Sequence, residues 1–227
     1  MIDWSVVIEY QDYFVRGFIT TIELTVVGLA FGLLIGLFLS LLQLSPKRLV
    51  RLPARIYIDI FRGTPLMLQV LAIHYAVIPM IYEDFLGLVP PDGLFSGFVA
   101  LSLNAGAYIA EIIRAGVQSI EKGQLEAARS LGMSYGQAMR HVILPQAFRN
   151  MLPPLGNEAI TLLKDSSLVT MIAVNDITYA AFSTAKNTFE RLAPYLTAAI
   201  MYFVLTFVLS RLVLYLEKRD LSRGGRN

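Results

Sequence analysis

Five apolar blocks separated by polar stretches dominate the chain. They cover approximately residues 15–43, 55–81, 94–115, 153–178 and 194–216. A helix needs about 20 apolar residues to cross a bilayer, and the backbone must satisfy its own hydrogen bonds there, which favours helices. The pattern therefore predicts an all-α integral membrane protein of five transmembrane helices, organised as a single domain over residues 1–227.

Composition supports a membrane protein. Hydrophobic residues make up 56% of the chain and charged residues 16%, whereas soluble domains carry about 25% charged residues. A soluble enzyme is therefore excluded. The absence of cysteine excludes disulfides and thiolate metal sites. His74 and His141 lie far apart in the sequence, so we expect no metal site.

The distribution of lysine and arginine predicts the orientation. Basic residues cluster in the first polar loop, in the long central loop and after the last apolar block; the first loop holds Lys47, Arg48, Arg51 and Arg55. On the other side, the N-terminus is acidic, the next loop carries Glu83, Asp84 and Asp92 with no basic residue, and the last loop carries only Lys186 and Arg191 as basic residues. Because basic loops stay in the cytoplasm, we expect the N-terminus outside and the C-terminus inside.

The central polar loop, about residues 116–150, is the most informative stretch. Ala127, Ala128 and Leu131 recur at helical spacing and predict a small apolar surface. Gly132 permits a sharp turn, and Pro145 is expected to end the second helical stretch. The loop therefore predicts a compact cytoplasmic knob that fits a groove on a partner protein.

The spacing within this loop is specific. Glu126, Ala127 and Ala128 are followed after three residues by Gly132, and nine residues later by Val142, Ile143, Leu144 and Pro145. The pattern resembles the E-A-A signature of bacterial ABC importer permeases, with Val142 in place of the usual isoleucine. Other stretches resemble polar amino acid permeases of the glutamine, histidine and arginine uptake type, over about residues 14–217. These stretches are Arg62–Pro65, Asn104–Glu111, Leu152–Glu158 and Lys164–Ser167.

The resemblance implies a type I ABC importer permease core in the bacterial cytoplasmic (inner) membrane. It implies a second permease subunit, either identical or a close relative, two cytoplasmic ATPase subunits that dock on the Glu126 segment, and an extracytoplasmic amino-acid-binding protein. The coupling residues would be Glu126, Ala127, Ala128, Leu131, Gly132, Leu144 and Pro145. ATP and magnesium would sit on the ATPase, since this chain has no phosphate-binding P-loop sequence. We expect no cofactor, catalytic residue or nucleic-acid partner for this chain.

A break in the second apolar block marks a candidate substrate pathway. Gly63, Thr64 and Pro65 disfavour helix, and broken spans often mark the substrate site of transporters. Asp59 lies about one turn before the break and Gln69 about one turn after it. A simple proline kink is the alternative.

Two further polar groups are candidates for the same pathway. The fourth block contains Lys164, Asp165, Ser166 and Ser167, and the third contains Asn104 and Tyr108, four residues apart on one helix face. Structural hydrogen bonding is the alternative for both groups.

The charges within the blocks suggest a substrate class. Acidic residues exceed basic ones: Asp59, Glu111, Glu158 and Asp165 against Arg62, Arg114 and Lys164. This excess favours a basic amino acid among polar substrates. Two pairs among these charges are spaced to meet on one helix face and form ion pairs: Asp59 with Arg62, and Glu111 with Arg114.

Other readings of the same residues stay open. A secondary transporter would use Asp59 or Asp165 as a proton or sodium site, and a passive channel or scaffold would need neither ATP nor a binding protein. Gly28, Gly32 and Gly36 predict a close helix contact, either within the chain or with another subunit.

Overall fold

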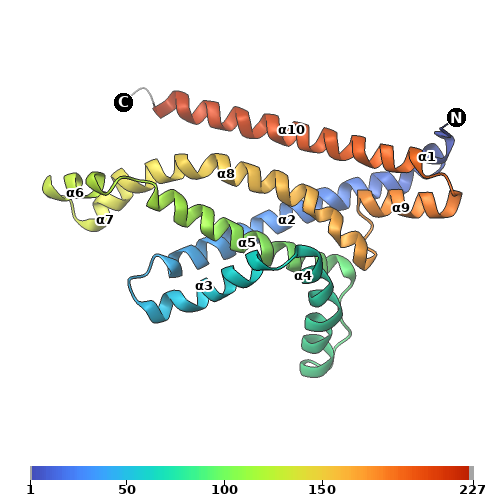
Figure 1. The fold of residues 1–227 in the computed structure, drawn as a ribbon, viewed down its shortest axis with the longest axis horizontal. Coiled ribbons are helices and arrows are strands. Elements are labelled where there is room, and N and C mark those ends of the chain that lie inside the picture. Colours follow the sequence, from blue (N-terminus) through green and yellow to red (C-terminus); the bar gives the residue numbers. More distant parts are fainter. Residues whose placement is uncertain (1, 225–227) are drawn as a thin grey trace.

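The computed structural model describes residues 2–224, and side chains up to residue 219. Every regular element in that range is helical (Figure 1). The α-helices are α1 (Ser5–Glu9), α2 (Gln11–Gln43), α3 (Arg48–Gly63), α4 (Leu66–Ala72), α5 (Gly93–Gln118), α6 (Lys122–Ser130), α7 (Tyr135–Ala138), α8 (Leu144–Asp165), α9 (Ile177–Thr188) and α10 (Leu192–Gly224). Three π-helical segments, η1 (Ile73–Val77), η2 (Met80–Phe85) and η3 (Met139–Ile143), and one 3-10 segment, η4 (Ser166–Ile172), complete the fold.

The number of spans agrees with an all-helical membrane protein. Four helices are long and apolar enough to cross a bilayer: Gln11–Gln43, Leu66–Phe85, Gly93–Gln118 and Leu192–Arg219. A fifth is present if Tyr135–Ile172 and Ile177–Thr188, which meet at a bend of 44°, form one span. The all-α membrane fold expected from the apolar blocks is therefore confirmed.

The centre of the bundle is the contact between α2 and α5. A Cβ atom added at Gly32 would lie 2.8 Å from Ala105 Cβ, and one at Gly36 would lie 2.6 Å from Ile109 Cγ2. These glycines let the two helices approach closely. The glycine stripe therefore packs within the chain, which decides between the two alternatives that the sequence left open.

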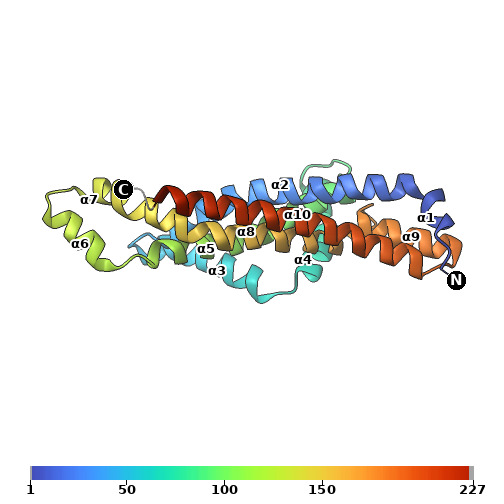
Figure 2. The same ribbon diagram turned by 90° about the horizontal axis from the view of Figure 1, so that it is seen from above.

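The second apolar block is divided between two helices. α3 ends at Gly63, Thr64 and Pro65 are extended, and α4 begins at Leu66. Figures 1 and 2 together show that α4 and the π segments after it leave the bundle and run across its long axis. The helix break expected at Gly63–Pro65 is present, and it redirects the chain.

A buried carboxylate closes one end of the bundle. Asp176 is fully buried and caps α9 by accepting hydrogen bonds from the backbone N–H groups of Thr178 and Tyr179. The hydroxyl groups of Thr170 and Tyr202 also donate to it. Asp176 therefore ties η4, α9 and α10 together. The opposite end of the bundle carries α6 and α7 (Figure 2).

Candidate functional site

The E-A-A segment, Glu126–Pro145, forms two short helices joined by a tight turn. α6 ends at Ser130, and Gly132 follows with a φ of +86°. Only glycine adopts this left-handed conformation without strain. Ser134 then caps α7 in a capping box with Gln137. The turn expected at Gly132 is present, and we call residues 126–145 the coupling segment.

The apolar residues of the coupling segment face two directions. Leu131 is 83% exposed, and Glu126 and Ala127 are also exposed. Ala128 is buried. The prediction that Ala127, Ala128 and Leu131 form one exposed surface is therefore wrong for Ala128. Ala128 follows Ala127 directly, and successive residues on a helix point about 100° apart. Ala127 and Leu131 are available to a partner, whereas Ala128 anchors α6.

The expectation that Pro145 ends a helical stretch is wrong. Helical structure runs from Tyr135 to Ile172 without interruption, and Pro145 lies in the first turn of α8. A proline is tolerated in a first turn, and here the π-helical segment η3 precedes it. The exposed side chains of Leu144 and Pro145 therefore begin a long helix that joins the coupling segment to the membrane bundle.

The helix break is held by one buried glutamine. The Gln69 Nε2 donates to the carbonyl oxygens of Phe61 (2.8 Å) and Thr64 (3.0 Å) and to Thr64 Oγ1 (2.8 Å). Asn104 Nδ2 donates to Gln69 Oε1 at 2.8 Å. Thr64, Gln69 and Asn104 thus lie together, and the Gln69 amide satisfies carbonyl groups that the end of α3 leaves open. This is the structural hydrogen bonding that the sequence left as the alternative for Asn104. Pro65 starts α4 beside them.

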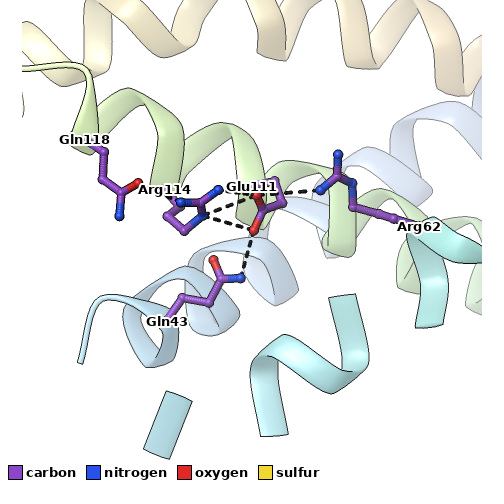
Figure 3. Close-up of polar contacts among 5 residues, drawn as sticks. All are labelled: Gln43, Arg62, Glu111, Arg114 and Gln118. Atoms are coloured by element: carbon purple, nitrogen blue, oxygen red, sulfur yellow. Dashed lines mark hydrogen bonds and ion pairs between the residues drawn. The ribbon is translucent and has the colours of Figure 1, made fainter. Parts of the chain in front are cut away.

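A second network lies about two helical turns along α5 from Asn104, around Glu111 (Figure 3). Arg114 donates to both carboxylate oxygens, at 2.6–3.2 Å, and also to Gln118 at 2.6 Å. Arg62 lies 3.6 Å from Glu111 Oε2, and Gln43 Nε2 donates to Oε1 at 2.8 Å. The expected Glu111–Arg114 pair is present. Glu111 therefore joins the ends of α2, α3 and α5.

This network borders a polar pocket of about 250 Å³. We call it the arginine pocket; it is lined by Gln43, Arg51, Arg55, Asp59, Arg62, Glu111, Arg114 and Gln118. Within the described side chains, Asp59 and Arg62 form no ion pair, because Arg62 turns to Glu111 and stacks 5.4 Å from the centre of the Tyr108 ring. Asp59 therefore faces a basic pocket and does not face the helix break.

A larger cavity of about 770 Å³ lies between α5 and the beginning of α8. Its polar lining includes Arg62, Tyr108 and Glu111 on one side and Arg149 and Asn150 on the other. Of the expected pathway residues only Tyr108 lines it. The cavity nevertheless meets the helix break, because Arg62 is the penultimate residue of α3.

The Lys164–Ser167 group lies deeper along α8, where the helix tightens into η4. Ser166 is buried and donates to the carbonyl of Leu163, so its role is structural. Lys164 is exposed, and Asp165 and Ser167 are partly exposed. Glu158 lies two turns before Asp165 and interacts electrostatically with both Asp165 and Arg62. The charge of Glu158 is repelled by that of Asp165 and attracted by that of Arg62.

The expected site list omitted several residues that the structure shows to be connected. Gln43 contacts Glu111 across 68 positions of sequence, and no local pattern predicts such a contact. Asp176 was also omitted, although an aspartate directly before the apolar stretch Ile177–Phe182 is a recognisable helix-capping signal. In the sequence, Glu158 is distinguished only as one of four acidic residues within the apolar blocks.

Comparisons with known proteins agree with this geometry. Residues 28–220 match the family model of the binding-protein-dependent transport system inner membrane component. The arginine transport system permease protein ArtQ of Bacillus subtilis strain 168 is 39% identical over 92% of this chain and 93% of its own. The glutamate/aspartate import permease protein GltK of Escherichia coli O157:H7 is 38% identical over 96% of this chain and 97% of its own.

A solved structure extends the likeness to three dimensions. A crystal structure of an amino acid ABC transporter with histidines contains a chain that is 40% identical, covers 96% of this chain and 99% of its own, and superposes with a TM-score of 0.85. These matches assign the molecule to a family. The chain belongs to the family of binding-protein-dependent transport system inner membrane components, as a multi-pass permease subunit of a bacterial ABC transporter that is not itself catalytic.

Proposed function

We propose that this chain forms the pathway by which an ABC importer moves polar amino acids, preferentially basic ones, into the cytoplasm. The observation that carries the proposal is the coupling segment. Its left-handed turn at Gly132 presents the exposed Leu131 at the end of a rigid helix pair, in the E-A-A spacing of importer permeases. Such a knob can transmit the motion of a partner into α8.

The assembly we propose has three kinds of subunit: permease, ATPase and binding protein. Two copies of this chain, or this chain and a close relative, pair in the membrane, and two cytoplasmic ATPases dock on the two coupling segments. An extracytoplasmic binding protein delivers the amino acid. The basic loops, including Lys47 and Arg48 at the start of α3, support a cytoplasmic coupling segment and an N-terminus outside. ATP and magnesium belong to the partner ATPase.

The proposed substrate path runs along the cavity between α5 and α8. Arg62 suits a substrate carboxylate, since its guanidinium presents a planar fork of donors. Glu158 and Asp165 lie seven residues apart on one face of α8, and both are partly exposed. The cavity lining carries Arg62 and Arg149, and we propose that the carboxylates of Glu158 and Asp165, further along α8, favour a substrate with a cationic side chain. Relatives named for arginine and for glutamate and aspartate transport share this fold.

The proposed cycle uses the continuity of α7, η3 and α8. Closure of the partner ATPases would draw the two coupling segments together, and because helical structure continues from Tyr135 to Ile172, the motion would pass directly to the helix that carries Glu158. The cavity would then open outward to receive the amino acid from the binding protein. Reopening of the ATPases would return it to the cytoplasmic side.

Reconstitution tests the proposal. Proteoliposomes would contain this chain alone, or with its cognate ATPase and binding protein, and a mixture of labelled amino acids would be supplied on the binding-protein side. We expect ATP-dependent accumulation only in the complete mixture, with arginine, lysine or histidine as the main label. Uptake by the chain alone, sensitive to ionophores and indifferent to ATP, would instead identify a secondary carrier that uses Asp59 or Asp165, or a passive channel.

A Glu158→Gln variant tests the substrate preference separately. We expect it to reduce accumulation of a basic amino acid relative to glutamine, because one of the two carboxylates is lost while the shape of the side chain is kept. The matched control is Glu121→Gln, which removes an exposed carboxylate at the start of α6. An unchanged preference in the Glu158 variant would refute the role of the α8 carboxylates while leaving the importer intact.

A further inference from the structure

We propose that the arginine pocket binds the headgroup of an anionic phospholipid. The position of the pocket supports this first. Gln43 and Gln118, which line it, are the last residues of the candidate spans Gln11–Gln43 and Gly93–Gln118. The pocket therefore lies beside the ends of two candidate spans, in a region rich in arginine, and we place it at the level of the lipid headgroups. Basic pockets between membrane helices commonly hold anionic headgroups.

The charge of the pocket favours an anion. Four arginines face two carboxylates, which leaves a surplus of two positive charges. Glu111 is already engaged by Arg62 and Arg114. Among the described side chains, neither Arg51 nor Arg55 lies within ion-pair distance of a carboxylate. These two guanidinium groups are therefore available to phosphate oxygens, which match their paired donors in geometry.

The apolar surface next to the pocket favours a lipid over a free anion. α3 exposes an apolar stripe beside its arginines: Leu49 (85%), Leu52 (47%), Ile56 (50%) and Ile60 (55%). Arg51 and Arg55 precede Leu52 and Ile56 by one residue each, so the charged stripe lies about 100° around the helix from the apolar one. A ligand that fills both surfaces has an anionic head and an apolar chain, as a phospholipid has.

The experiment compares two matched double variants in the complete transporter. The complex would be purified, equilibrated with equal amounts of phosphatidylglycerol and phosphatidylcholine, and its retained lipids measured by native mass spectrometry. Arg51→Gln with Arg55→Gln removes two charges from the pocket. Lys47→Gln with Arg48→Gln removes two charges just before it, at residues that do not line it.

We expect the wild type and the Lys47/Arg48 variant to retain phosphatidylglycerol preferentially. In the Arg51/Arg55 variant the ratio of the two lipids should fall by on the order of tenfold, because each basic residue near an anionic surface contributes measurably to binding. Arg51→Lys with Arg55→Lys should keep most of the preference. The double lysine variant shows whether a loss of lipid comes from the lost charge or from misfolding. The temperature of thermal unfolding in phosphatidylcholine alone must also be equal for all variants compared.

Four results would overturn the proposal. An unchanged ratio in the Arg51/Arg55 variant would exclude the pocket. An equal fall in the Lys47/Arg48 variant would indicate a diffuse surface charge. Inorganic phosphate that displaces phosphatidylglycerol at millimolar concentration would identify a free-anion site. Finally, if Leu52→Ser with Ile56→Ser separates the two permease copies without changing the lipid ratio, the apolar stripe would be an interface between copies.

Discussion

The two ends of α2 contact two carboxylates with opposite surroundings. Near its beginning, Gly17 packs against the backbone of Asp176, whose side chain is fully buried and bound only by neutral donors. At its end, Gln43 binds Glu111, whose partners Arg62 and Arg114 keep side-chain exposures of 43% and 35%. One carboxylate is fully occupied by hydrogen bonds, and the other borders a pocket whose Arg51 and Arg55 have no ion pair among the described side chains.

The different surroundings of Asp176 and Glu111 distinguish a carboxylate that stabilises the fold from one that is available for function. A buried carboxylate is tolerated only when hydrogen bonds compensate for its lost hydration, so the network around Asp176 is complete and fixes the bend between η4 and α9. The network around Glu111 borders two cavities and includes excess charge. Polar groups of the second kind are available to substrate, lipid or a moving partner.

Asp176→Ala should have the largest effect on stability. It leaves the hydroxyl groups of Thr170 and Tyr202 and the N–H groups at the start of α9 without their acceptor, which costs about 3 kcal/mol. Denaturation in detergent, followed by circular dichroism, measures the loss. Asp92→Ala is the matched control, since Asp92 also caps a helix but is exposed and accepts only from the Phe95 N–H. It should cost about 1 kcal/mol, and equal losses would contradict the contrast.

Gly36→Ala tests the packing between the two ends. The added Cβ would lie 2.6 Å from Ile109 Cγ2 and 3.0 Å from the Ala110 backbone nitrogen, so the helices must separate, at a cost of about 1–3 kcal/mol. Gly123→Ala provides the control, because nothing lies within 4 Å of the added atom and alanine favours helix by up to about 1 kcal/mol. Thermal unfolding should thus shift in opposite directions, and a stable Gly36 variant would refute the close contact.

Gln69→Leu tests whether the helix break depends on one side chain. The substitution removes the donor to Phe61 and Thr64, so we expect a loss of about 1–2 kcal/mol in the free energy of unfolding. Gln146→Leu, which removes a single bond to the carbonyl of Val142, should cost less. Combining Gln69→Leu with Asn104→Ala should give less than the sum of the two losses, because the residues share a hydrogen bond; strict additivity would argue against the network.

Glu111→Gln should have the smallest effect on stability, about 1 kcal/mol or less, because its partially exposed ion pairs are screened by water. The rate of ATP-dependent uptake should fall clearly even though the free energy of unfolding changes little, because Arg62 would lose its carboxylate partner at the helix break. Parallel measurement of unfolding and of ATP-dependent uptake checks this. A loss of stability as large as that of Asp176→Ala, with normal uptake in the surviving protein, would assign Glu111 to architecture as well.

Patterns close together in sequence predicted much of this structure. Apolar block length predicted the helical membrane fold, and the residues Gly63, Thr64 and Pro65 predicted the break, because both depend on local backbone preferences. The spacing from Glu126 to Pro145 predicted a helical pair with a turn at Gly132. Local patterns failed where the outcome depends on neighbours: Pro145 was expected to end a helix, and lies in the first turn of α8.

Contacts between distant segments were not predictable in the same way. The bond between Gln43 and Glu111 depends on how α2 packs along α5, and that packing depends on glycines whose partner helix the sequence did not identify. Arg62 could form an ion pair with its helical neighbour Asp59 or with Glu111, which lies 49 positions away in the sequence. Such choices follow from the packed geometry, so the candidate pathway was the part of the molecule least accessible to sequence patterns.

The most direct test of the account uses Gly132→Asp in the complete reconstituted importer, with ATP hydrolysis and amino acid uptake measured in the same proteoliposomes. Gly132 has open space around it but a left-handed backbone, where most side chains cost about 1–2 kcal/mol and aspartate less. Aspartate also places a negative charge beside the exposed Leu131, and a combined cost of about 1.4 kcal/mol corresponds to about tenfold in an equilibrium. Gly123→Asp, in regular helix with equally open space, is the control. The account predicts normal membrane insertion and retained ATP hydrolysis but uptake reduced at least about tenfold only in the Gly132 variant; normal ATP-dependent uptake by that variant would contradict the role of the coupling segment.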